Sequence, residues 1–239
     1  YGAWRGPLIP ASEVWDVVRG IDERGVLGGV DALLSGYQGG ADVGAVILQA
    51  CDLIKERNPR AIYCCDPVMG DVGRGFYARP GIPEFMRDSV APRADVMTPN
   101  LFELEFLTGR TTSSTAEVID AAHALRAIGP DTVLVTSVTD ETSSDEVMRM
   151  IVVTGEGAWQ VETPLLHRTF TGSGDLTTAM FLAHLLATGS AADALSATAS
   201  IVYSVLEQTA RLDQSELALV AAQANLTDPA FRFEATRLP

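Results

Sequence analysis

Apolar residues along the chain follow two periods, and the order of those periods predicts a sheet covered by helices. Helical spacing extends over residues 11–24, 41–57, 101–107 and 116–128. Short buried runs at residues 30–35, 61–65, 96–98 and 132–137 lie between these segments and are typical of strands. Strands alternating with helices predict an α/β fold with a mostly parallel central sheet and helices on both faces.

The second half of the chain departs from strict alternation. Residues 148–154 and 158–163 are joined through a Gly-Glu-Gly turn and predict an antiparallel hairpin. Residues 176–186, 191–212 and 215–224 are expected to be helical. Residues 68–77 contain three glycines after a strand, which indicates a functional lid rather than a plain connection. Since nothing resembles a linker, we expect one domain over residues 1–239, its first helix capped by Ser12.

Charge and cysteine content narrow the function classes. Seventeen Lys and Arg against 31 Asp and Glu give a formal net charge of −14, which argues against nucleic acid or an anionic membrane as the main partner. Apolar runs fall short of the roughly 20 residues of a membrane span, and no signal peptide is visible. Cys51, Cys64 and Cys65 form no CxxC pair and predict a reducing cytoplasm. Being adjacent in a strand, Cys64 and Cys65 should face opposite sides of the sheet.

Polar side chains follow the predicted strands where each strand ends. Because ligands of such sheets lie outside the carboxyl ends of the strands, we expect these side chains to converge on a small-molecule site. The residues concerned are Ser35, Tyr37, Asp66, Asp71, Thr98, Asn100, Thr136, Ser137 and Asp175.

The segment from Gly172 through Ser173 and Gly174 to Asp175 precedes an apolar helix. Two glycines around one small residue allow a sharp turn, so that backbone N–H groups at the helix N-terminus can bind an anion. A carboxylate in the first turn can accept a proton from an attacking hydroxyl. The alternative interpretation is a glycine-rich loop with an acidic first turn and no chemistry.

Four stretches occur in this order along the chain: Ser35 to Tyr37, Asp66 to Asp71, Thr98 to Glu103 with its continuation to Gly109, and Gly172 to Asp175. Together they resemble the pyridoxal kinases of the ribokinase superfamily. The resemblance extends from Tyr1 almost to the last residue. It implies a ribokinase-like fold and the transfer of the γ-phosphate of ATP to the 5′-hydroxymethyl group of pyridoxal, pyridoxine or pyridoxamine.

The resemblance also implies roles for individual residues. Asp175 matches the catalytic base, with Gly172, Ser173 and Gly174 as the anion hole, and residues 70–81 match a flap that closes over ATP. Asp66, Asp71 and Glu103 match acidic positions that arrange Mg²⁺, and a monovalent cation such as K⁺, around the phosphates. Tyr37 and Tyr77 match contacts to the vitamin ring. The positions implied for ATP binding are Asp66, Thr98, Asn100, Glu103, Thr136, Ser137, Thr169 and Thr171.

Two departures from the family pattern keep alternatives open. Relatives carry a strand, a helix and a strand before the position matching Tyr1, so we expect this sequence to lack that N-terminal segment, which supplies a serine and a threonine to the substrate. Several relatives carry a basic residue near the position of Thr136, and this chain does not. We expect a cytoplasmic homodimer. The alternatives are a hydroxymethylpyrimidine kinase and a protein that binds pyridoxal without phosphorylating it.

Overall fold

The main sheet of the molecule has a parallel half and an antiparallel half. The structure is a computed structural model that describes residues 9–139 and 146–239, so Tyr1 lies outside the described residues. Strands β1, β2, β5 and β6 are parallel neighbours, and β7, β8 and β9 extend the sheet antiparallel, in the order β1-β2-β5-β6-β7-β8-β9. Their bounds are Ala32–Ser35, Ile62–Cys65, Val96–Met97, Thr132–Val138, Val147–Val153, Ala158–Pro164 and Thr236–Arg237. The α/β fold and the β7–β8 hairpin predicted from the sequence are confirmed.

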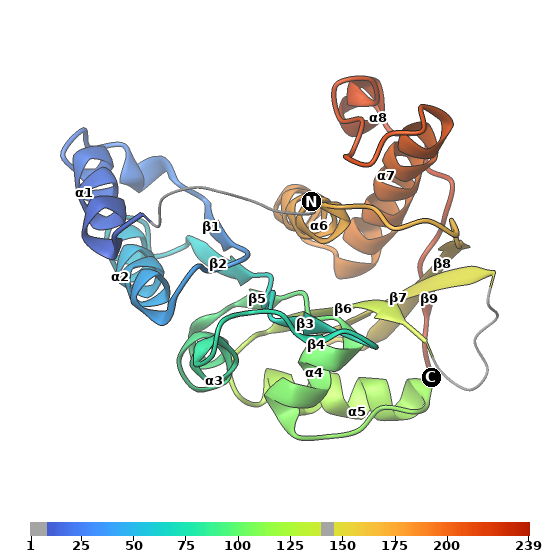
Figure 1. The fold of residues 1–239 in the computed structure, drawn as a ribbon, viewed down its shortest axis with the longest axis horizontal. Coiled ribbons are helices and arrows are strands. Elements are labelled where there is room, and N and C mark those ends of the chain that lie inside the picture. The colour runs from blue at the N-terminus through green and yellow to red at the C-terminus, as the bar shows by residue number, and fades with distance from the viewer. Residues whose placement is uncertain (1–8, 140–145) are drawn as a thin grey trace.

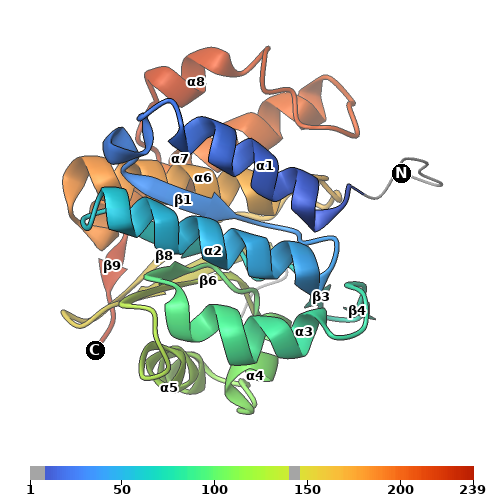
Figure 2. The same ribbon diagram turned by 90° about the vertical axis from the view of Figure 1, so that its left-hand side faces the viewer.

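Helices cover both faces of this sheet, as Figures 1 and 2 show. One face carries α2, α3, α4 and α5, and the other face carries α6 and α7. Helix α1 packs on α2. The bounds of α1 to α7 are Ala11–Asp22, Ala41–Arg57, Ile82–Phe85, Leu101–Thr108, Thr115–Arg126, Ser173–Thr188 and Ala191–Arg211. Among the described residues, none of the helices is long and apolar enough to cross a membrane.

Two hydrophobic clusters, one on each face, hold the helices to the sheet. Cys65, with Met97 of β5, belongs to the cluster under α2, α4 and α5, whereas Cys64, with Val96, packs against α6 and α7. The two cysteines therefore face opposite sides, as their adjacency in a strand predicts. This alternation buries both faces of β2 and β5, which fixes the strand ends relative to one another.

The structure corrects two local predictions and adds detail to a third segment. Helix α1 begins at Ala11 with Pro10 as its N-cap residue, so Ser12 lies inside the first turn. Residues 215–224 are largely not helical, because Ala218 N–H donates to the Thr209 hydroxyl at 3.0 Å and Glu216 forms a bridge to Thr171; only the short α8 (Gln223–Thr227) is helical. The glycine-rich loop contains a small antiparallel hairpin formed by β3 (Gly70–Asp71) and β4 (Gly75–Phe76).

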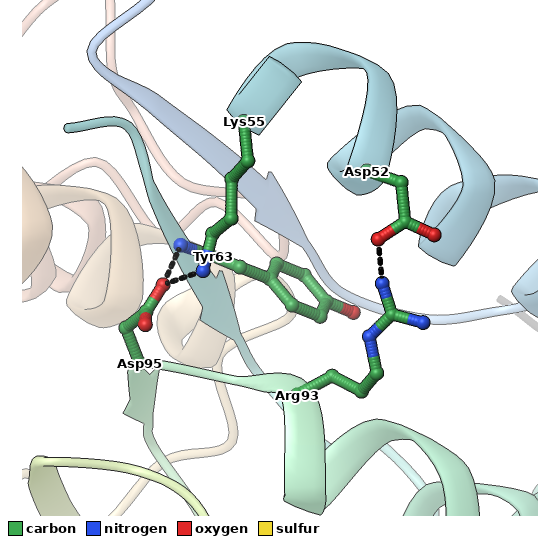
Figure 3. A network of polar contacts seen from close by, with 5 residues as sticks. All are labelled: Asp52, Lys55, Tyr63, Arg93 and Asp95. Carbon is green, nitrogen blue, oxygen red and sulfur yellow. Dashed lines mark hydrogen bonds and ion pairs between the residues drawn. The ribbon is translucent and has the colours of Figure 1, made fainter. Parts of the chain in front are cut away.

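A polar network joins α2 to the amino end of β5 (Figure 3). Oδ2 of Asp95 accepts hydrogen bonds from Nζ of Lys55 and from the backbone N–H of Tyr63, both at 2.6 Å. Beside it, Arg93 donates to the carboxylate of Asp52. The network ties a helix to two neighbouring strands at a position away from the strands' carboxyl ends.

Candidate active site

The N-terminus of α6 lies over the carboxyl ends of the parallel strands. Gly172 caps the helix with φ of 87°, a left-handed conformation that glycine adopts without strain. Ser173 is the first helical residue and Asp175 the third. A Cβ at Gly36, after β1, would lie 3.3 Å from Oδ1 of Asp175, so glycine at this position leaves room for that carboxylate. The turn therefore presents backbone donors and a carboxylate at one place.

A cavity of about 410 Å³ opens beside this helix N-terminus. Its lining includes every residue to which the sequence assigns a catalytic, binding or metal-holding role: Tyr37, Asp66, Asp71, Tyr77, Thr98, Asn100, Glu103, Thr136, Ser137, Thr169, Thr171, Gly172, Ser173, Gly174 and Asp175. Ser35 is the exception among the polar strand ends, because its hydroxyl lies 2.9 Å from the buried hydroxyl of Tyr63. The convergence expected of the strand ends is thus observed for all the others.

Glu103 is the best-connected carboxylate of the cavity. Asn100 caps α4, accepting from the backbone N–H of Glu103 at 2.9 Å, while Oε2 of Glu103 accepts from Asn100 N–H at 3.0 Å. Its Oε1 accepts from Met69 N–H at 3.0 Å. Burial raises the pKa of Glu103 to about 8, although these backbone donors oppose the shift. Glu103 thereby links the start of α4 to the segment that enters the β3–β4 hairpin.

Asp66 and Asp175 approach each other across the cavity. Asp66 is 7% exposed, and a Cβ at Gly174, next to Asp175, would lie 3.6 Å from its Oδ2. Burial, and then repulsion from Asp175, raise the pKa of Asp66 to about 7, opposed by a hydrogen bond from Thr178. Such a concentration of carboxylates favours a bound cation, which would relieve the repulsion.

The described residues do not form a complete metal cage. Among them, no three His, Cys, Asp or Glu side chains are grouped closely enough to enclose a metal ion. Mg²⁺ keeps several waters and commonly binds through one or two carboxylates together with substrate phosphates. Asp66 and Glu103, which are buried and have oxygen donors, fit this open kind of site better than a cage built from protein ligands alone.

Two hydroxyl-bearing positions owe their placement to the strands. The hydroxyls of Thr98, after β5, and Thr178, in α6, lie 2.7 Å apart and join the sheet to the helix. Ser137 adopts φ of 54° where the register between β6 and β7 shifts. Bulges of this kind redirect a side chain, and positive φ in a residue other than glycine is uncommon. Ser137 therefore departs from the alternation of side chains along β6, and it lies at the edge of the cavity.

The β3–β4 hairpin forms one wall of the cavity. Phe76 contacts the rings of Phe102 and Phe106 of α4 edge to face, with centroid distances of 4.9 and 5.1 Å. The guanidinium of Arg74 lies 5.2 Å from the ring centroid of Tyr77. Burial and nearby carboxylates, Glu103 first, raise the pKa of Tyr77 to about 12. The aromatic contacts hold the hairpin against α4, beside the carboxylates of Asp66 and Glu103.

A second cavity, of about 280 Å³, adjoins the first. The two linings share seven residues, so they form one continuous cleft: Asp71, Thr136, Ser137, Thr169, Phe170, Ser173 and Gly174. The second part is lined mainly by apolar side chains from β7, α7 and the segment before α6: Met148, Met150, Leu165, Leu166, Phe170, Val202, Tyr203 and Leu206. The cleft therefore has an acidic, polar end and an apolar end.

Comparisons with known proteins agree with this geometry. The model of the phosphomethylpyrimidine kinase family matches residues 39–219. A pyridoxal kinase of Rubrobacter xylanophilus is 51% identical over 239 residues, which span all of this chain and 82% of that protein. The chain belongs to the pyridoxal kinases of this family. A pyridoxal kinase of Leifsonia xyli is 46% identical over the whole chain and 84% of that protein.

Solved structures place this kinase in the ribokinase-like fold. A pyridoxal kinase from Leishmania donovani, in complex with ADP and pyridoxine, has a TM-score of 0.90 at 24% identity, covering 100% of this chain and 84% of that one. A phosphomethylpyrimidine kinase, described as putative, from Bacteroides thetaiotaomicron has a TM-score of 0.85 at 23% identity, covering 97% and 80% of the two chains. At these identities the likeness shows a shared fold.

Sequence reasoning missed four residues that line the acidic cavity of this kinase, namely Val68, Arg74, Phe170 and Thr178. Helical spacing indicates Thr178, which lies one turn after Asp175. Arg74 stands between two glycines, and φ values of 76° at Gly73 and 69° at Gly75 allow the tight turn that carries it. Arg74 brings positive charge to a lining otherwise rich in carboxylates.

Proposed function

We propose that this kinase transfers the γ-phosphate of ATP to the 5′-hydroxymethyl group of pyridoxal, and also of pyridoxine and pyridoxamine, with Asp175 as general base. The single observation that carries the proposal is the 51% identity to a pyridoxal kinase over the whole chain. The structure of the Leishmania donovani relative in complex with ADP and pyridoxine supports the same substrate classes.

The cleft has the parts that phosphoryl transfer requires. The reaction depends mainly on positioning and on stabilisation of charge on the transferred group. Backbone N–H groups of Gly172, Ser173 and Gly174 lie at the positive end of α6, where they stabilise a phosphoryl group. Asp175, in the same turn, accepts the proton of the attacking hydroxyl.

The two parts of the cleft suit the two ends of a nucleotide. The apolar cavity accepts the flat purine base, and four of the residues shared by both cavities, Thr136 and Ser137 with Ser173 and Gly174, contact the sugar and phosphates. Thr98, Asn100, Thr169 and Thr171 line the phosphate end. Tyr37 and Tyr77, from two different loops, take the vitamin ring, and the flap of residues 70–81 excludes water that would otherwise accept the phosphoryl group.

The carboxylates of the cavity are the ligands that we propose for cations. Asp66, Asp71 and Glu103 would hold Mg²⁺ in an open site shared with waters and the substrate phosphates, with K⁺ as a second, monovalent cation, and Mg²⁺ would neutralise charge on the phosphates. Burial raises the pKa of Asp66 and of Glu103, and a bound cation would favour their ionised forms. The resemblance alone supports a homodimer in the cytoplasm, and sedimentation of the purified protein tests the dimer.

A second candidate substrate is hydroxymethylpyrimidine. The family model that matches residues 39–219 is described as phosphomethylpyrimidine kinase, and both substrates present a hydroxymethyl group on a heteroaromatic ring. The same Asp175 chemistry serves either ring. The choice between them depends on the ring contacts.

Coupled ADP release, measured with pyridoxal and with hydroxymethylpyrimidine at equal ATP and Mg²⁺, tests the assignment. We expect kcat/KM to be higher for pyridoxal, with one pyridoxal 5′-phosphate formed per ADP released. Higher kcat/KM for hydroxymethylpyrimidine would establish the second candidate. Binding of pyridoxal without ADP release from either substrate would overturn both and indicate a non-catalytic binder.

A further inference from the structure

A segment after α8, residues 231–235 (the strap), lies along α7. In Figure 1 this part of the chain runs from α8 past α7 to the β8 edge of the sheet. The backbone N–H groups of Arg232 and Phe233 donate to the hydroxyl of Ser200 at 3.0 and 3.2 Å, and Ala235 N–H donates to the hydroxyl of Ser196 at 2.9 Å. Because Ser196 and Ser200 lie one turn apart on α7, these bonds fix the register of the strap along the helix.

Two strap side chains surround the ring of Tyr203. Phe233 contacts it edge to face, with the centroids 5.2 Å apart and the planes at 75°. The guanidinium of Arg232 lies 4.7 Å from the centroid of the same ring, and its Nη1 pairs with Glu207 Oε2 at 3.1 Å. Tyr203 is only 8% exposed. Its ring is thus held by an aromatic contact and a cation–π contact made from outside α7.

Tyr203 also lines the apolar cavity of the cleft. Ala199, Val202 and Leu206 of α7 lie beside it in that lining, so one face of the helix forms the cavity wall. Neither Arg232 nor Phe233 is among the lining residues. Any influence of the strap on a molecule in the cavity therefore passes through α7 and Tyr203.

The strap is anchored at its far end to a second wall of the same cavity. Beyond residue 235, β9 pairs with Trp159 and Gln160 of β8, and Nη2 of Arg237 donates to Glu156 O at 2.7 Å. Further along β8, Thr163 and Pro164 line the cavity. The chain from Arg232 to Arg237 therefore connects the helical wall of the apolar cavity to its strand wall.

We propose that Arg232 and Phe233 are positioning residues, which hold Tyr203 in place as part of the purine-binding wall and so set the affinity for the nucleotide. The inference rests on the proposed function in assigning the apolar cavity to ATP. Loss of the strap contacts frees the Tyr203 ring, and the purine then has to order that ring when it binds. This cost falls on binding of ATP, so KM for ATP rises while kcat changes little.

Steady-state kinetics of Phe233→Ala and Arg232→Met test the proposal. An aromatic pair contributes about 0.5–1.5 kcal/mol, so we expect KM for ATP to rise about two- to tenfold. KM for pyridoxal and kcat should stay within about twofold, and Phe233→Tyr, which keeps the ring, should restore the KM for ATP. Phe231→Ala is the matched control: it removes a phenylalanine ring from the same strap, one that is 69% exposed and lies outside the lining of the cleft, and it should leave the KM for ATP unchanged.

A binding measurement separates this inference from the proposed function. Calorimetric titration with ADP alone measures nucleotide affinity without any turnover, and we expect Phe233→Ala to weaken it by the same factor. If Phe233→Ala does not fold, Arg232→Met and Phe233→Leu carry the test. Unchanged ADP affinity in variants that fold, or an equal loss in Phe231→Ala, overturns the positioning role and leaves the strap a purely structural element.

Discussion

Replacement of Glu103 by glutamine should change how the stability of the protein depends on pH. Glu103 is 3% exposed and accepts backbone N–H groups from Met69 and Asn100. Its pKa rises from 4.5 in the unfolded chain to about 8 in the folded one, chiefly because burial penalises the charge. Glutamine has nearly the same shape and no charge to bury.

The sign and size of the effect follow from proton linkage. Because the folded pKa is raised, the contribution of Glu103 to stability is fully present below pH 4.5 and is lost as the pH rises towards 8. A single group changes the free energy of unfolding by at most about 1.4 kcal/mol per pH unit in such a window. The wild type should therefore lose stability relative to Glu103→Gln by about 1 kcal/mol per pH unit between pH 5 and 8.

Urea unfolding of both proteins at pH 5, 6, 7 and 8, in chelator and without nucleotide, measures this difference. Glu105→Gln serves as the control on the same helix. Oε1 of Glu105 accepts hydrogen bonds from the backbone N–H and the hydroxyl of Thr112, and Glu105 does not line the cavity. Its pH dependence should be parallel to that of the wild type. A wild type and Glu103→Gln that change in parallel would refute the raised pKa of Glu103.

Two further variants test the hairpin and the network away from the site. Phe76→Ala removes two ring contacts with α4, together worth about 1–3 kcal/mol, so trypsin should cleave the native protein at Arg74 about five- to hundredfold faster; an unchanged rate would show that the rings do not hold the hairpin. Asp95→Ala leaves the Tyr63 N–H and Lys55 without their carboxylate (Figure 3), and should lower the free energy of unfolding by about 1–3 kcal/mol at constant KM values. A changed KM with unchanged stability would contradict this structural role.

Local pattern predicts the parts of the fold that depend on local forces. Helix α2 runs from Ala41 to Arg57 as expected, because its apolar period is regular and Gly40 and Asn58 bound it. Strand β9 has no such signal: two residues become a strand only because Trp159 and Gln160 lie beside them, far away in sequence. The helix predicted over residues 215–224 is wrong for a related reason. The Ala218 N–H donates to the hydroxyl of Thr209, nine residues earlier, instead of to a backbone carbonyl within a helix.

The candidate site also has a part that the sequence predicts and a part that it does not. Its acidic and hydroxyl-bearing residues were predictable because strand carboxyl ends meet at one edge of a sheet, and all of the predicted ones except Ser35 line one cavity. The apolar cavity was not predictable from the sequence, because residues such as Met150 and Val202 have the pattern of ordinary core positions. The raised pKa of Glu103 likewise depends on depth of burial, which no spacing along the chain encodes.

Rapid-quench measurement of a single turnover of ATP with pyridoxal tests the central claim most directly. Asp175→Asn is compared with Asp193→Asn, since Asp193 is the third residue of α7 as Asp175 is of α6 but lines a different cavity. We predict that Asp175→Asn slows formation of pyridoxal 5′-phosphate by about 10²- to 10⁴-fold at unchanged ADP affinity, while Asp193→Asn equals the wild type. Transfer by Asp175→Asn at the wild-type rate would contradict the role of Asp175 as base.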